Sequence, residues 1–169
     1  ENPFNHYLDF LKELKELTDE EWRLSQGPGW EFLHIVETTS MSKSYKMPIL
    51  LAFYNDGEIK MGITEEDVYQ SCKAFYEKDQ NWRDMEKDKN TRDFRSWDKK
   101  RYVSEARKNP VHFLKESGSG FFVDREGFVL ALRDDLRDVV TEPAFVQHMK
   151  DIIDYRTMNY YRQRYEKGE

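Results

Sequence analysis

The sequence has one cysteine, no basic excess and no long apolar run, and each shortage removes a class of protein. A lone Cys72 cannot form an internal disulfide, and we read it as a small buried hydrophobe in a reducing, cytoplasmic compartment. The longest apolar stretch, residues 47–54, is far shorter than the roughly 18 residues that a transmembrane helix needs. Because the start also lacks the basic and apolar regions of a signal peptide, we expect a soluble protein with no membrane partner.

What is present suits one modest domain. The 169 residues are 38% hydrophobic and 15% aromatic, which is enough to bury a core. The net charge is −6, whereas proteins dedicated to nucleic acids usually carry a basic excess. Any DNA contact must therefore use a local basic face. The chain begins with Glu1 rather than Met, which favours a piece of a larger protein.

Residues 1–29 are expected to form a helical lead-in. Apolar residues at spacings of three and four predict a helix over 4–17. Thr18 and Glu21 have the spacing of a capping box, which predicts a second helix. Gln26-Gly27-Pro28-Gly29 is expected to end that helix, because glycine and proline do not continue one.

Residues 30–136 are predicted to form a core, although the apolar stretch 30–36 does not by itself distinguish helix from strand. The expected elements are a helix beginning at Ser42 or Ser44 with Pro48 in its first turn, a turn at 55–57, a strand over 58–63, a helix from Thr64, a helix over 99–108, and a hairpin of 121–123 with 128–132. Asn109 and Pro110 are expected to cap and restart the helix after residue 108. Residues 137–169 are expected to form a C-terminal extension, whose helix over 142–165 packs on the core.

This order predicts a mainly α, α+β fold with a small β hairpin: a winged-helix-like core with N- and C-terminal helical extensions. In such a domain the third helix enters the DNA major groove and the hairpin contacts the backbone. On that helix, Tyr102, Val103 and Ala106 share one side. The opposite side carries our DNA-contact candidates, which form either a phosphate-contacting face or an ordinary solvated surface: Lys100, Arg101, Ser104, Arg107 and Lys108.

Residues 77–100 differ from the rest of the predicted core. Fifteen of these twenty-four residues are charged, with Trp82, Phe94 and Trp97 scattered among them. The composition predicts a long solvated loop or a loose helical insertion with exposed aromatic side chains.

No catalytic or metal site is predicted. The chain has no GxxxxGK[ST] loop for ATP, and capping explains Asp19-Glu20-Glu21. Glu58-Ile59-Lys60 resembles the acid–x–lysine strand of restriction-type nucleases, without that strand's upstream acidic partner. The four histidines lack the spacing of metal ligands: His6, His34, His112 and His148. We therefore expect no enzyme activity and no cofactor in this chain.

Three stretches together resemble a C-terminal module that follows the motor in bacterial superfamily II (DEAD/DEAH-type) helicases, including restriction-associated ones. They are Thr39-Ser40-Met41-Ser42-Lys43-Ser44-Tyr45-Lys46-Met47-Pro48-Ile49-Leu50-Leu51, Lys108-Asn109-Pro110-Val111-His112-Phe113-Leu114 and Asp154-Tyr155-Arg156-Thr157-Met158-Asn159-Tyr160-Tyr161. The resemblance implies a parent protein that uses ATP and Mg²⁺ in its motor and acts on DNA. The matching positions are Lys43, Ser44, Tyr45, Lys46, Asn109, Pro110, His112, Arg156 and Tyr160.

Some of these positions also suggest roles of their own. Lys43 and Lys46 lie near a helix beginning, where positive charge opposes the helix dipole, so both join the DNA-contact candidates as residues seeking an anion. Arg156 is expected to pair inside the fold with a carboxylate or a backbone carbonyl, and His112 to hydrogen-bond within the core.

Three hypotheses follow. The chain contacts DNA through a basic helix and a hairpin wing, or it docks on the helicase motor as a protein-interaction module, or it is an autonomous enzyme such as a nuclease. The sequence specifies neither an oligomeric state nor a preferred DNA structure.

Overall fold

The computed structural model describes residues 7–13 and 15–166, so His6 and the start of the helix expected from residue 4 lie outside the described residues. It is mostly helical, with two small antiparallel sheets, which confirms the α+β class. The first half contains α1 (Tyr7–Glu13), α2 (Asp19–Leu24), α3 (Pro28–Thr38), α4 (Lys46–Ala52), β1 (Tyr54–Asn55), β2 (Glu58–Ile59), β3 (Gly62–Ile63) and α5 (Glu65–Glu77). The second half contains α6 (Arg83–Lys87), a 3₁₀ turn (Phe94–Ser96), α7 (Lys99–Ala106), a π-helical turn (Arg107–Val111), α8 (His112–Ser117), β4 (Phe122–Val123), β5 (Leu130–Leu132), a 3₁₀ turn (Asp134–Leu136), α9 (Pro143–Tyr161) and a second π-helical turn (Arg162–Glu166).

Capping chemistry starts two of the helices where the sequence predicts. The Thr18 hydroxyl accepts from the backbone N–H of Glu21, whose side chain accepts from the backbone N–H of Thr18. Thr64 and Asp67 form the same reciprocal pair at the start of α5. The segment 26–29 ends α2 as expected, but Pro28 also begins α3 as its first residue. Proline suits that position because it has no N–H to leave unpaired and its φ is already helical. The stretch 30–36 is therefore helical.

The strand expected over 58–63 is divided between two sheets. Glu58–Ile59 pairs with Tyr54–Asn55 across the turn that contains Gly57, whose φ of 95° favours glycine. Gly62–Ile63 instead joins a three-stranded sheet of order β3-β5-β4, in which Gly62 lies opposite Ala131 and Phe122 opposite Leu132. The strand between α4 and α5 thus pairs with the second strand of the predicted hairpin.

The charged segment 77–100 is a folded cap, so the expectation of a loose, solvated insertion is wrong. Phe94 is fully buried against Tyr76, with ring centroids 6.1 Å apart, and Trp97 packs edge-on against Tyr102 at 5.3 Å. Thr91 donates to the backbone carbonyl of Met85 at 2.6 Å. The aromatic residues are widely spaced along the chain but meet the same apolar surface, and this burial orders the segment.

Asn109 does not cap a new helix, because α7 continues into α8 without interruption. The two helices are joined by the π-helical turn Arg107–Val111, with Pro110 inside it and no side-chain cap at its start. An α-helical turn would bring the proline ring against a preceding carbonyl, and the wider π turn relieves that clash. The prediction that His112 hydrogen-bonds in the core is also wrong: its side chain is exposed and lies 3.4 Å from the Glu116 carboxylate.

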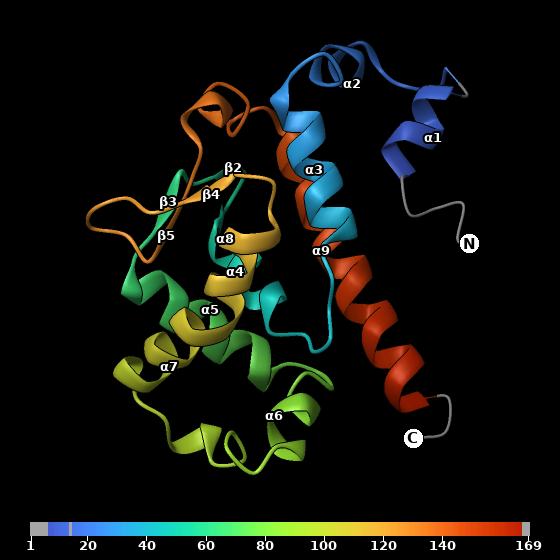
Figure 1. The fold of residues 1–169 in the computed structure, drawn as a ribbon. Helices are drawn as coiled ribbons and strands as arrows, with labels where there is room; N and C mark the ends of the chain where they lie inside the picture. The colour runs from blue at the N-terminus through green and yellow to red at the C-terminus, as the bar shows by residue number, and fades with distance from the viewer. Residues whose placement is uncertain (1–6, 14, 167–169) are drawn as a thin grey trace.

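The long helix α9 runs alongside α3, as Figure 1 shows. Phe145, Met149 and Ile153 line its buried side. Arg156 donates through Nη1 to the backbone carbonyl of Val36 at 3.0 Å, which confirms its expected pairing inside the fold.

Candidate functional site

Helix α7 presents its predicted basic side to solvent. Tyr102, Val103 and Ala106 are buried against α5, as the helical wheel predicts. Of the five candidates on the opposite side, Ser104 is half-buried and the four basic residues are exposed: Lys100, Arg101, Arg107 and Lys108.

Carboxylates lie against most of this basic face. The Glu105 carboxylate is 3.2 Å from Arg101 and 3.9 Å from Lys108, and the Arg107 guanidinium is 3.8 Å from Glu65. Lys99 pairs with Glu66 at 3.2 Å. Within the described part of the chain, Lys100 alone of these basic residues has no carboxylate within 4 Å. Such exposed pairs are weak, yet they cancel much of the positive field that attracts phosphates.

The two lysines near the start of α4 have partners inside the fold. Lys46 is only 8% exposed, and its ammonium donates to the Thr39 hydroxyl and to the Ser40 carbonyl, both at 2.9 Å. Burial lowers the pKa of Lys46. Its assignment as a DNA contact is therefore wrong, because the side chain is largely buried and its ammonium already donates to Thr39 and Ser40. The Lys43 ammonium lies 3.7 Å from the Asp88 carboxylate, so an intramolecular anion satisfies the charge for which we expected an external one.

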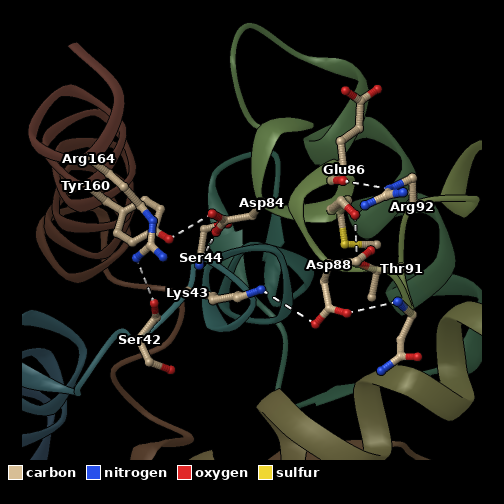
Figure 2. A network of polar contacts seen from close by, with 12 residues as sticks. Ser42, Lys43, Ser44, Asp84, Glu86, Asp88, Thr91, Arg92, Tyr160 and Arg164 are labelled. Carbon is tan, nitrogen blue, oxygen red and sulfur yellow. Dashed lines mark hydrogen bonds and ion pairs between the residues drawn. The ribbon is translucent and has the colours of Figure 1, made fainter. Parts of the chain in front are cut away.

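The 42–46 segment brings two of the three family-like stretches together. The hydroxyls of Ser44 and Tyr161 are hydrogen-bonded at 2.7 Å, and Arg164, just beyond the third stretch, donates to the Ser42 carbonyl at 3.2 Å. Figure 2 shows the 42–44 backbone between the C-terminal helix on one side and the cap on the other. The second stretch, residues 108–114, reaches the first through the π-helical turn, which contacts α4.

Asp84 is the centre of this polar network, and sequence reasoning missed it. The residue is 1% exposed, and its carboxylate accepts three hydrogen bonds: from the Ser44 backbone N–H at 2.8 Å, from the Tyr160 hydroxyl at 2.8 Å and from the Tyr165 hydroxyl at 2.9 Å. Burial and this carboxylate raise the pKa of Tyr160, and they raise the pKa of Tyr165 to about 12. Nothing in the sequence distinguishes Asp84 from the other acidic residues of the cap, since its burial depends on tertiary contacts alone.

The network holds the 42–46 segment, the cap and α9 together. The hydroxyl of Tyr161 donates to the Asn81 carbonyl at 2.8 Å, which joins α9 to the cap a second time. Burial raises the pKa of Tyr161 above the ordinary tyrosine value, so the hydroxyl stays protonated at neutral pH. Across residues 7–13 and 15–166, no group of three His, Cys, Asp or Glu side chains is placed to hold a metal ion.

A half-open pocket of about 190 Å³ lies between the 42–46 segment, the cap and α7. Four aromatic residues, two carboxylates and two asparagines contribute to its wall. The lining residues are Tyr45, Cys72, Tyr76, Met85, Asp88, Asn90, Thr91, Trp97, Tyr102, Glu105, Ala106, Asn109 and Pro110. The wall includes three family-matching positions, Tyr45, Asn109 and Pro110, whereas exposed His112 is outside it.

Two lining groups define the chemistry of the pocket. Burial raises the pKa of the Cys72 thiol to about 12, so this residue acts as the small hydrophobe that the sequence predicts. The hydroxyl oxygen of Tyr45 is buried, and the polar side chains of Lys43 and Thr91 lie near it. Burial also raises the pKa of Tyr45, although Lys43 and Thr91 nearby lower it.

No family model, curated protein or solved structure matches this chain. Within the described residues, no helix combines the length and the apolar character needed to cross a membrane.

Proposed function

We propose that the chain is a non-catalytic accessory module that docks on the motor domains of a superfamily II helicase. The observation that carries this proposal is the charge balance of α7, where carboxylates from α5 and from α7 itself lie against most of the predicted DNA-contacting side chains. A surface whose basic groups are already paired gives little electrostatic affinity for phosphates.

The outer side of α9 is the surface that we propose for docking. Tyr155 and Met158 are 55% and 58% exposed, and residues three apart lie on the same side of a helix. Their neighbours Arg156, Tyr160 and Tyr161 turn toward the body of the protein and hold the helix in place. Aromatic and methionine side chains are enriched at protein interfaces, which supports a protein partner for this side of the helix.

Contact with duplex DNA is the second candidate, and the arrangement of the core favours it. The chain order of α4, β3, α5, α7, β4 and β5, with sheet order β3-β5-β4, agrees with a winged-helix-like core. In that arrangement α7 and the turn between β4 and β5 would face the DNA. The turn weakens this candidate, because Asp124 and Glu126 flank its Arg125 and Lys115 already pairs with Asp124 at 3.0 Å.

The docking proposal is tested by mixing the chain with separately produced motor domains of the proposed parent helicase. Binding measured by calorimetry is expected to weaken at least tenfold in Tyr155→Ser/Met158→Ser, since truncating interface anchors costs about 2 kcal/mol or more. Phe113→Ser is the matched control, because Phe113 is similarly exposed, at 44%, but lies on α8. Equal loss in both variants, or no complex at all, refutes docking through α9.

A titration of fluorescent duplex and forked DNA at two salt concentrations separates the two candidates. Docking without DNA contact predicts weak binding at low salt that Lys100→Glu/Lys108→Glu barely changes. Tight binding at low salt, with a steep salt dependence that these substitutions reduce, establishes the DNA-contacting function instead.

A further inference from the structure

The outer side of α9 carries a regular stripe of exposed residues. Four of them follow one another at spacings of four, three and four: Asp151, Tyr155, Met158 and Arg162. This alternation is that of the a and d positions of a coiled coil, and it places the four side chains on one side of the helix. In Figure 1 the C-terminal part of α9, which contains this stripe, runs along the edge of the molecule.

The stripe is apolar at its centre and oppositely charged at its ends. Tyr155 and Met158 form the centre, one turn after Asp151 and one turn before Arg162. Arg162 directly follows the helix, and its φ of −62° and ψ of −46° continue the helical backbone. No ion pair joins Asp151 or Arg162 to another described residue, although Asp151 accepts a hydrogen bond from Gln147 at 2.8 Å. Both charges are therefore available to a partner.

A reversed second copy of the stripe complements it at every position. In a pair related by a two-fold axis, a contact from Tyr155 to Met158 of the second copy also occurs in the opposite direction. The axis then passes midway between these two positions. Asp151 and Arg162 are equally distant from that midpoint, so the aspartate of each copy faces the arginine of the other.

The charges also select the direction of the second helix. A parallel pair in register would place Asp151 against Asp151 and Arg162 against Arg162, and like charges on neighbouring helices repel. The antiparallel pair has one contact of opposite charge at each end of the apolar centre instead. The stripe thus fits a reversed copy of itself better than a copy that runs in the same direction.

We infer that two copies of this chain associate through α9, antiparallel and related by a two-fold axis, with Tyr155 against Met158 and Asp151 against Arg162. Two apolar side chains per copy are far fewer than a standard interface contains, so the dimer is transient and forms at high protein concentration. It covers the side of α9 that we propose for docking, and a motor domain must therefore displace the second copy. The dimer itself does not depend on docking.

Sedimentation equilibrium of the chain alone, from micromolar to millimolar concentration, tests this inference with two charge reversals. Asp151→Arg places two arginines together at each end, and Arg162→Asp places two aspartates together. Each variant is expected to associate with itself about tenfold more weakly than the parent, or less. An equimolar mixture of the two variants is expected to regain the parent's association, because each end of the mixed pair again joins one aspartate to one arginine.

Glu126→Arg is the matched control. It changes the net charge by as much as Asp151→Arg, and Glu126 is also exposed, but it lies in the turn between β4 and β5. Its association should equal that of the parent. Thermal melts of each variant alone exclude unfolding as the cause of a loss, and recovery in the mixture requires that both variants are folded.

Three results overturn the inference. They are a parent chain that stays monomeric at millimolar concentration, association that neither reversal weakens, and a mixture that associates no better than either variant alone. None of them bears on docking, whose test uses a second protein and different substitutions.

Discussion

Replacement of Asp84 by asparagine removes the carboxylate that joins the cap, the 42–46 segment and α9. The carboxylate accepts from the Ser44 N–H and from the Tyr160 and Tyr165 hydroxyls, all within 2.9 Å. An asparagine side chain has the same shape but presents one NH₂ group to a donor, so at least one of these donors loses its acceptor. The remaining hydrogen bonds also lose their charge assistance.

The magnitude follows from these contacts. One buried donor without an acceptor costs about 1–3 kcal/mol, and a hydrogen bond to a charged group contributes about 1.5–3 kcal/mol. We therefore expect Asp84→Asn to lower the free energy of unfolding by about 2–4 kcal/mol. Asp84→Ala, which leaves all three donors unpaired and opens a small cavity, is expected to cost more.

Urea denaturation followed by circular dichroism measures this free energy. Asp79→Asn is the control, because Asp79 lies on the same cap but is exposed, and its φ of 51° is one that asparagine tolerates. A double-mutant cycle with Tyr160→Phe isolates the Asp84–Tyr160 hydrogen bond, for which we expect a coupling energy of about 1–2 kcal/mol. If Asp84→Asn costs no more than Asp79→Asn, or if the coupling is zero, the assigned role of Asp84 in holding α9 on the cap is wrong.

Three further predictions concern buried or half-buried groups. The raised pKa of Tyr165, about 12 in the folded protein, lies above the value of about 10 for an unfolded chain, so the folded state binds more protons between these pH values. The stability that this hydroxyl contributes is thus fully present below pH 10 and is lost as the pH rises toward 12. A pH series of thermal melts with tyrosinate absorbance measures this loss, and a melting temperature that does not change over this range contradicts the prediction. The Cys72 thiol should react with a thiol reagent only as fast as the protein unfolds, with reactivity in denaturant as the reference. Lys46→Glu should lower the melting temperature, because it places a carboxylate against the Ser40 carbonyl that now accepts from the ammonium, at a cost of about 1–3 kcal/mol. Lys43→Glu should have a much smaller effect, and equal effects would mean that Lys46 is not buried in solution.

Local chemistry decided much of the fold in advance. Thr18 and Thr64 start helices because their hydroxyls and the acidic residues three positions later satisfy free backbone N–H groups, a contact that depends only on sequence spacing. The sides of α7 were predictable for the same reason, since helical periodicity places Tyr102, Val103 and Ala106 together.

Tertiary structure decided the rest. Composition marked residues 77–100 as solvated, yet Phe94 and Trp97 are buried because surfaces distant in sequence meet them, and no local pattern encodes that meeting. Lys46 was predictable as a charge near a helix start but not as a buried one. The site depends most strongly on such contacts: Ser44 and Tyr161, which are 117 positions apart, become hydrogen-bonded neighbours around Asp84. The sequence by itself determined where α2, α5, α7 and α9 begin and which side of α7 is apolar. Only packing determined which polar groups were removed from water, because burial is a property of the assembled fold.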